Sequence, residues 1–187
     1  MPTFIKPAKV VGKSLTFRDT RCEDAKFILE LRIDPSKGRH LSATSGDLSA
    51  QVAWLERYAA DPSQIYFIIE DQNGERVGTV RLYDQQRSSF CWGSWILKAG
   101  VPSGYAIESA LMVYAFARSL SFTAAHFDVR KGNESVWQFH ERMGAGRTGE
   151  TEQDIFYSID AAAIEATTKR YRRYLPNPIQ ITPKAPT

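Results

Sequence analysis

The chain has 187 residues, of which 43% are hydrophobic and 24% charged, and its formal net charge is +3. This length and composition predict a single folded domain with a core of its own and exclude a disordered chain. No apolar run is long enough for a signal peptide or a membrane helix, so we expect a cytoplasmic protein with no membrane partner.

The positive charge lies at the two ends of the chain. Residues 1–13 and 169–187 carry eight basic and no acidic residues, whereas residues 14–168 carry 16 basic and 21 acidic residues, a balance of -5. An acidic body argues against a broad nucleic-acid-binding face, so no nucleic-acid partner is expected. Cys22 and Cys91 lack the spacing of a zinc site or a disulfide framework, which fits a reducing compartment.

The first half of the chain predicts two helices followed by three strands. In chain order, we expect a strand at 14–18, a helix at 19–32, a loop at 33–45, a helix at 47–60, and strands at 65–71, 75–84 and 89–97. Asn73-Gly74 lies between the first two of the three strands and is a strong hairpin signal, so these strands should form an antiparallel meander.

The second half predicts a crossover and a final strand pair. We expect a buried helix at 103–120, a strand at 125–130, a helix at 133–143 with Asn133 as its N-cap, strands at 146–151 and 154–159, and a basic helix at 161–175. The tail from Pro176 has four prolines in twelve residues and is expected to be extended or disordered.

These elements predict an α/β (α+β) fold in one domain. Its sheet would be mixed but mostly antiparallel, with six to seven strands and about four flanking helices. The expected divisions are an N-terminal extension at 1–13, the domain at 14–160, the basic helix at 161–175 and a proline-rich tail at 176–187.

The junction at 98–108 is a candidate anion site. A strand ends there, glycines and a proline turn the chain, and the apolar helix begins. Free backbone N–H groups and the helix dipole favour a phosphate at such a helix N-terminus, and Gly104 and Ala106 leave room for it. An ordinary strand-to-helix turn is the alternative interpretation.

Two motifs and the order of elements resemble the GCN5-related N-acetyltransferase (GNAT) family over about residues 14–160. The family's pyrophosphate loop, Arg/Gln-x-x-Gly-x-Gly/Ala, reads here Val101-Pro102-Ser103-Gly104-Tyr105-Ala106. Val101 departs from the basic or amide residue, which leaves backbone N–H groups and Lys98 to hold the phosphates. A second family pattern is matched by Asn133, His140 and Gly144, with His140 where the family most often has Tyr.

The resemblance implies acetyl-CoA as co-substrate, no metal, and a strand before the pyrophosphate loop that splays from its neighbour. It assigns pantetheine and acetyl contacts to Trp95, Ile96 and Leu97, phosphate contacts to the loop from Val101 to Ala106, and further contacts to Asn133 and His140. The backbone N–H of Ile96 would stabilise the oxyanion. His140, with an imidazole charged part of the time near neutral pH, would assist the departing thiolate. Core packing is the alternative role for these apolar residues.

No general base is named from the sequence. Glu70, Asp71 and Asp84 are carboxylates near the ends of the meander strands, where the acceptor cleft of such a fold would open. His126 and Asp128 share a strand face with Arg130 by period two, and we interpret them as a structural row of ion pairs rather than as substrate contacts.

The candidate acceptor-binding residues are polar side chains on the 33–45 loop and the meander: Arg32, Arg39, His40, Arg81, Tyr83 and Asp84. Arginines suit a nucleotide diphosphate, and a tyrosine can stack on a base. Phrases such as Gly78-Thr79-Val80-Arg81-Leu82-Tyr83 and Phe139-His140-Glu141-Arg142 look similar to acetyltransferases of nucleotide-linked amino sugars.

We therefore expect acetyl transfer to the primary amine of a nucleotide-linked amino sugar, a small-molecule substrate. A peptide or protein N-terminus, as in ribosomal-protein acetyltransferases, is the alternative. The charge balance of -5 over residues 14–168 suits this acceptor better. A non-catalytic domain that binds acetyl-CoA is a second alternative. A homodimer is a further expectation.

Overall fold

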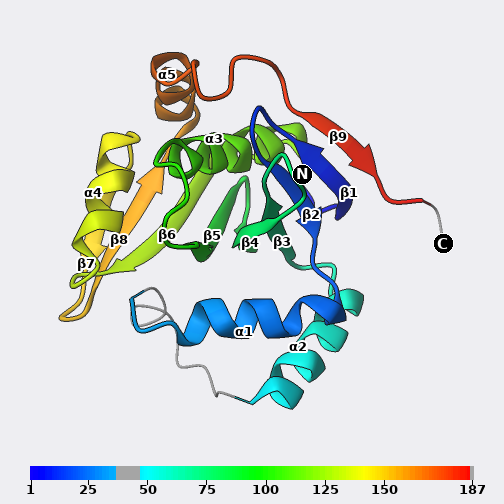
Figure 1. The fold of residues 1–187 in the computed structure, drawn as a ribbon. Coiled ribbons are helices and arrows are strands. Elements are labelled where there is room, and N and C mark those ends of the chain that lie inside the picture. The colour runs from blue at the N-terminus through cyan, green and yellow to red at the C-terminus, as the bar shows by residue number, and fades with distance from the viewer. Residues whose placement is uncertain (37–46, 186–187) are drawn as a thin grey trace.

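A nine-stranded sheet organises the computed structural model, which describes residues 1–36 and 47–185. The strands are β1 (Pro7–Val11), β2 (Thr16–Asp19), β3 (Ile65–Glu70), β4 (Arg76–Gln86), β5 (Ser89–Leu97), β6 (Ala124–Arg130), β7 (Gly146–Glu150), β8 (Asp154–Ile159) and β9 (Gln180–Pro183). The helices are η1 (Cys22–Asp24), α1 (Ala25–Ile33), α2 (Leu48–Ala60), α3 (Gly104–Ser119), α4 (Glu134–Arg142) and α5 (Ala161–Arg170). Their spatial arrangement is shown in Figure 1.

The strand order is β7-β8-β6-β5-β4-β3-β2-β1-β9. Within the described sheet only β5 and β6 pair in parallel, joined by the α3 crossover, and the other neighbours are antiparallel. The predicted hairpin is confirmed at β3–β4, where Gly74 has φ +76° and its N–H donates to the Asp71 carbonyl at 3.0 Å. The mixed, mostly antiparallel fold is therefore confirmed.

Helices cover both faces of the sheet. Helices α1 and α2 lie on one face, and α3 lies on the other with α4 and α5 (Figure 1). The first face packs Leu31 and Leu55 against Ile96, whereas α3 contributes a nearly continuous buried surface to the larger core on the second face. The all-round apolar character of α3 is thus explained by burial on several sides.

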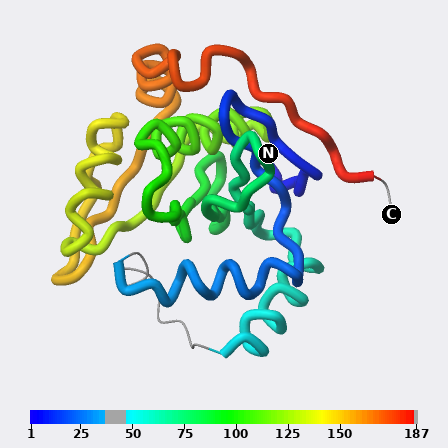
Figure 2. Tube along the Cα trace, viewed as in Figure 1, coloured from blue at the N-terminus to red at the C-terminus, as the bar shows by residue number. Residues whose placement is uncertain are grey.

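The strand count exceeds the six to seven predicted, because both ends of the chain join the sheet. β1 lies within the segment expected to be an N-terminal extension, and it pairs with β2 and with β9. The tail, expected to be extended or disordered, contains β9, and Lys184 Nζ donates to Asp19 just after it. β9 is an edge strand, the position in a sheet that tolerates proline. Figure 2 traces this return of the chain to β1.

The basic helix is shorter than predicted. α5 ends at Arg170 instead of extending to Leu175, and a turn follows in which Tyr174 N–H donates to the Tyr171 carbonyl at 2.9 Å. No helix among the described residues is long and apolar enough to cross a membrane.

Candidate active site

The sheet opens between β5 and β6. The two strands pair only at Ser89–Ala124, Phe90–Ala125 and Cys91–His126. Beyond that point β5 stays paired with β4 as far as Leu97, and β6 stays paired with β8 as far as Arg130. Residues 92–97 and 127–130 therefore diverge and leave what we call the strand opening, where the inner edge of β5 has no strand partner. This is the splay that the family resemblance implies.

A β-bulge sets which backbone groups of β5 face the strand opening. The register with β4 shifts by one residue around Ser94, which has φ +45°. After the bulge, Thr79 pairs with Ile96, and Lys98 N–H donates to the Val77 carbonyl at 2.8 Å. Backbone N–H groups alternate between the two edges of a strand, so the Ile96 N–H faces β4 and the Leu97 N–H faces the strand opening. The Ile96 N–H, expected from the family resemblance to be the oxyanion donor, is therefore directed toward β4 and not toward the strand opening.

The strand opening leads to the N-terminus of α3. Ser103 is the N-cap residue but makes no side-chain capping hydrogen bond, and the first turn contains no acid. The Tyr105 N–H donates to the Pro102 carbonyl at 3.0 Å, and other backbone N–H groups at the start of the helix are left for an anion. Val101 packs against the core and offers no polar group, while Lys98 is exposed with its Nζ 6.0 Å from the Phe27 ring centroid.

The space beside Gly104 is not open, contrary to expectation. A Cβ placed there would lie 3.1 Å from the ring of Tyr174, which belongs to the turn after α5. Glycine at this position therefore allows a C-terminal side chain to pack directly on the first turn of α3.

His140 is enclosed by aromatic rings from β5 and β6, the two strands that border the strand opening. Its ring centroid lies 4.3 Å from that of Phe127, 5.1 Å from Trp92 and 5.8 Å from Trp95. Burial lowers the pKa of His140 to about 3. The imidazole is therefore neutral at physiological pH, which corrects the expectation that it is partly charged.

One ring nitrogen of His140, Nδ1, is buried without a hydrogen-bond partner among the described residues. A buried polar atom without a partner is costly, and a bound group can satisfy it. Asn133 begins the same helix as its N-cap residue, yet its side chain makes no capping hydrogen bond. Both motif residues of α4 thus have polar groups that the helix itself does not use.

Of the predicted acceptor residues, Arg32 and Arg81 lie on the other face of the sheet, beside α1 and α2. Arg81 Nε donates to Gln64 Oε1 at 2.6 Å, and its guanidinium lies over the rings of Trp54 and Tyr83 at 5.3 and 4.4 Å. Within residues 1–36 and 47–185, Arg81 forms no ion pair with a carboxylate. Burial lowers its pKa, as expected for a cation without a counter-ion.

Gly93, near the point where the strand opening begins, leaves room for the side chain of Tyr83. The Tyr83 hydroxyl lies 3.2 Å from the position that a Gly93 Cβ would occupy. Arg32 Nη1 donates to Ser94 Oγ at 3.3 Å, one residue further along β5. The structure therefore brings Arg32, Arg81 and Tyr83 to one region, as predicted. Arg39 and His40, the other basic candidates, lie outside the described residues.

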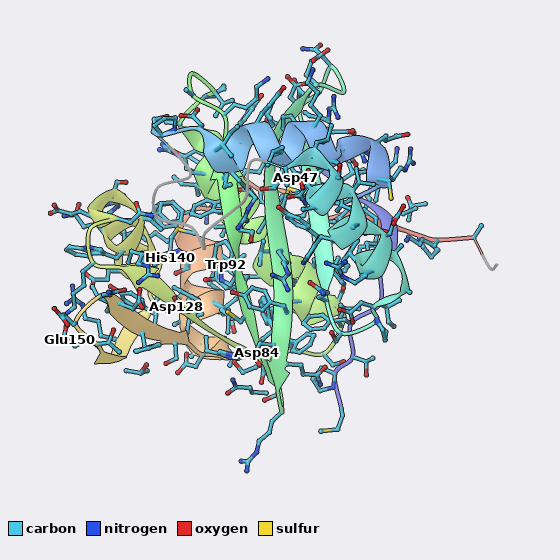
Figure 3. All side chains as sticks on the ribbon, turned by 90° about the horizontal axis from the view of Figure 1, so that it is seen from below. Asp47, Asp84, Trp92, Asp128, His140 and Glu150 are labelled. Carbon is cyan, nitrogen blue, oxygen red and sulfur yellow. The ribbon has the colours of Figure 1, made fainter. Side chains whose placement is uncertain are left out.

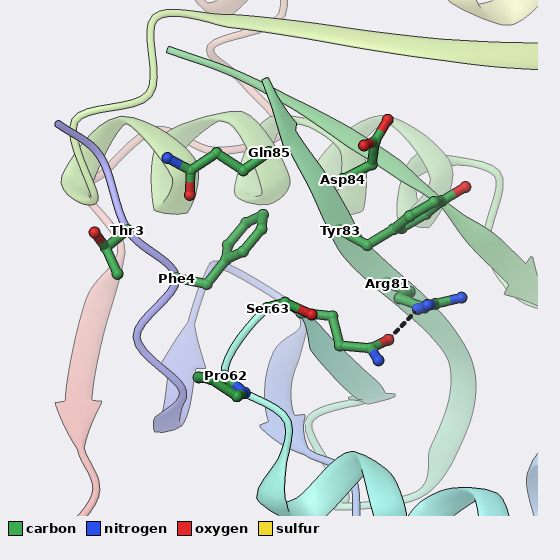
Figure 4. Close-up of a pocket in the computed structure, with 9 residues that line it drawn as sticks. Thr3, Phe4, Pro62, Ser63, Arg81, Tyr83, Asp84 and Gln85 are labelled. Carbon is green, nitrogen blue, oxygen red and sulfur yellow. Dashed lines mark hydrogen bonds between the residues drawn. The ribbon is translucent and has the colours of Figure 1, made fainter. Parts of the chain in front are cut away.

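A pocket of about 320 Å³ adjoins this region (Figure 4). Three predicted acceptor residues, Arg81, Tyr83 and Asp84, line it together with the 62–64 turn and the N-terminal segment. Asp84 accepts from His126 Nε2 at 3.1 Å, and this hydrogen bond lowers the pKa of the carboxyl. Asp84 is thus already partnered at the rim of the pocket.

The side chains of His126, Asp128 and Arg130 on β6 form only part of the row of ion pairs that we expected. His126 bridges Asp84 and the Ser89 hydroxyl, and Arg130 pairs with Asp154 at 3.3 Å. Asp128 forms no ion pair in the part of the chain that the structure describes. It lies two residues past His126, just beyond the last paired residues of the two strands.

Asp128, expected from the sequence only as part of a row of ion pairs, lies near the strand opening. In Figure 3 both Asp128 and Asp84 lie on the part of the sheet that α1 and α2 leave uncovered. Continuing the β5–β6 register from Cys91–His126 places Asp128 level with Gly93. Desolvation, followed by the charge of Asp154, raises the pKa of the Asp128 carboxyl. Strand alternation gave its face, but only the position of the strand opening shows its relation to the site.

This fold, with a strand opening that leads to a helix N-terminus, defines an acetyltransferase. The family model described as "Acetyltransferase (GNAT) domain" matches residues 14–146, so the chain belongs to the GNAT family of acyltransferases, whose domains use acetyl-CoA. Comparison with curated protein sequences gives no match.

Among solved structures, the chain is 34% identical to apo FdhC, described as a nucleotide-linked sugar GNAT. The match has a TM-score of 0.79 and covers 94% of this chain and 99% of that one. An acetyltransferase structure from T. thermophilus matches at 19% identity and a TM-score of 0.74, covering 89% and 96%. A spermidine N-acetyltransferase SpeG chimera from Vibrio cholerae and hSSAT matches at 16% and 0.70, covering 82% and 99%. The last two similarities show the fold alone.

Proposed function

We propose that this enzyme transfers the acetyl group of acetyl-CoA to the primary amine of a nucleotide-linked amino sugar. The observation that carries the proposal is Arg81, a partly buried cation at the acceptor side that has no carboxylate partner among the described residues. The diphosphate of a nucleotide sugar supplies the anion that such an arginine binds. The 34% identity to a protein described as a nucleotide-linked sugar GNAT supports the same substrate class.

Acetyl-CoA supplies the acetyl group as a thioester when bound. The first turn of α3 would hold its phosphates through backbone N–H groups, and Leu97 N–H would donate to the acetyl carbonyl oxygen, where negative charge develops. His140, being neutral, would donate a hydrogen bond toward the sulfur rather than act as a cationic acid. Asn133 at the start of α4 would be a further contact.

Asp128 is the residue that we assign as general base. An amine is protonated near neutral pH and must lose a proton before its lone pair attacks the acetyl carbon. Asp128 lies level with Gly93 on the acceptor face, and its raised pKa makes it a better proton acceptor than an ordinary aspartate. The second proton lost from nitrogen on forming the amide balances the proton gained by the departing sulfur.

The substrate class is tested by a thiol-release assay with UDP- and dTDP-linked amino sugars and N-terminal peptides. We expect turnover of at least one nucleotide sugar, and Arg81→Ala should raise its KM by more than tenfold while leaving the KM for acetyl-CoA unchanged, because a charged hydrogen bond contributes about 1.5–3 kcal/mol. Arg87→Ala, an exposed change in the turn after the same strand, is the matched control.

A peptide or protein N-terminus is the second candidate acceptor. It is favoured by the acidic body and by Asp84 and Asp128 on the open face, which suit an ammonium group. Turnover confined to peptides would overturn the sugar proposal and support this one.

A further inference from the structure

The segment that follows α5 packs against the first turn of α3. We call residues 171–175 the C-terminal arm. Its turn is held by Tyr174 N–H donating to the Tyr171 carbonyl and by Leu175 N–H donating to the Arg172 carbonyl, at 2.9 and 3.2 Å. The ring of Tyr174 lies against Gly104, the first residue of α3. In Figure 1, α5 and the chain after it lie over α3, on the face opposite α1 and α2.

The turn between β1 and β2 meets the same end of α3. Glu108 is buried in the second turn of the helix, and one carboxylate oxygen accepts the backbone N–H groups of Lys13, Ser14 and Leu15 at 2.8, 2.6 and 3.0 Å. Lys13 Nζ in turn donates to the Arg173 carbonyl at 3.1 Å. The C-terminal arm is therefore anchored to the start of α3 both directly and through the β1–β2 turn.

The contacts bring together basic side chains that no carboxylate of the described residues pairs with. Lys13, Arg172 and Arg173 form no ion pair with a carboxylate in residues 1–36 and 47–185, and Glu108 is already occupied by backbone donors. Arg173 Nη2 donates to Tyr174 Oη at 2.8 Å, and the guanidinium lies 4.8 Å from the ring centroid. One cation is thus held on the ring that covers Gly104.

The family loop has a basic or amide residue where this chain has Val101, which packs against the core. The phosphate end of the coenzyme carries a diphosphate and a 3′-phosphate, and the helix N-terminus alone supplies only partial positive charge. A guanidinium can donate two hydrogen bonds to a phosphate.

Resting on the proposed use of acetyl-CoA, we propose that the C-terminal arm is part of the coenzyme's phosphate site, with Arg173 as the phosphate ligand and Tyr174 as the residue that positions it. The arm thereby replaces the polar side chain missing at Val101. The proposal also gives a role to Arg173, which the proposed binding of the acceptor does not use.

The test compares CoA with 3′-dephospho-CoA by titration calorimetry on the full-length protein. Arg173→Ala should weaken CoA binding about tenfold, the size expected for one charge-assisted hydrogen bond. A loss with CoA alone assigns Arg173 to the 3′-phosphate, and an equal loss with both ligands assigns it to the diphosphate. Either outcome supports the proposal.

Lys169→Ala is the matched control, since it removes one exposed positive charge from α5, where Lys169 pairs with Glu165 at 2.9 Å. Tyr174→Phe keeps the ring on Gly104 but removes the hydrogen bond to Arg173, so it should weaken binding less than Arg173→Ala does. CoA affinity of Arg173→Ala equal to that of Lys169→Ala and the wild type would overturn the role of the arm. Wild-type protein that binds neither ligand would instead overturn the proposed function.

Discussion

His140 shows how one residue can match a family motif and still have different chemistry. The family position is usually a tyrosine, and a histidine there suggested a partly charged group. The structure surrounds the imidazole with the rings of Trp92, Trp95 and Phe127, which come from β5 and β6. Those strands are distant in sequence from α4, so the spacing of the motif could not indicate the burial that keeps His140 neutral.

The burial of His140 should make stability depend on pH. Its pKa in the folded state, about 3, is below the usual value of 6.5, so the unfolded chain binds the proton first. The stabilisation is complete above pH 6.5 and is lost as the pH falls from there toward 3. Urea unfolding at pH 7.5 and 5.5 should show the wild type losing on the order of 1 kcal/mol more than His140→Phe. Equal losses in the two proteins would contradict a buried neutral imidazole.

Asp128 gives a second prediction at the residue level. Asp128→Asn should lower kcat by a factor on the order of 100, the usual contribution of general base catalysis, and remove the acidic limb of the pH–rate profile. Asp154→Asn is the control, because the charge of Asp154 helps to raise the pKa of Asp128. It should keep kcat and move the acidic limb to lower pH. Acetyl-CoA affinity should be unchanged in both variants.

At the scale of elements, the strand opening between β5 and β6 is the feature of the sheet on which the candidate active site depends. The sequence predicts β5 with the bounds that the structure has, since an apolar and aromatic run is bounded there by turns around residues 87 and 99. It does not predict where β5 leaves β6, because that depends on the bulge at Ser94 and on neighbours in the sheet. The family resemblance supplied the splay, and the register was needed to find that Leu97 faces it.

Gly78 is predicted to be essential to this geometry. A Cβ at Gly78 would lie 2.3 Å from the carbonyl oxygen of Ile96, a backbone atom that cannot move without shifting β5. Gly78→Ala should therefore destabilise the protein by about 2 kcal/mol or more, as other severe steric changes do. Gly146→Ala, where the added carbon meets nothing within 4 Å, should stay within about 0.5 kcal/mol of the wild type. Denaturant midpoints measure both, and equal midpoints would contradict the close approach.

At the scale of the whole molecule, the two ends of the chain form the last two strands at one edge of the sheet. β1 and β9 pair at Val10–Ile181, and Lys184 reaches Asp19, which also accepts from the Tyr58 hydroxyl. Neither strand was predicted, because each is short, contains proline, and depends on a partner at the opposite end of the sequence. The homodimer expected from the sequence stays a prediction.

Removing residues 176–187 should lower the melting temperature by several degrees, because β1 loses its outer partner and Asp19 loses an ion pair. Lys184→Ala keeps β9 and removes only the ion pair, so it should have a smaller effect. Thermal unfolding followed by circular dichroism compares the two proteins. A truncated protein as stable as the wild type would contradict a structural role for β9.

The pairing of β1 with β9 also has a consequence for synthesis on the ribosome. β1 is made among the first residues, but its outer partner is made only after nearly all of the remaining chain. Until residues 180–183 have emerged, the outer edge of β1 has unpaired backbone groups that can pair with another nascent chain. Translation that stalls late would therefore yield a chain that already contains the acetyltransferase sheet but still exposes one edge to aggregation.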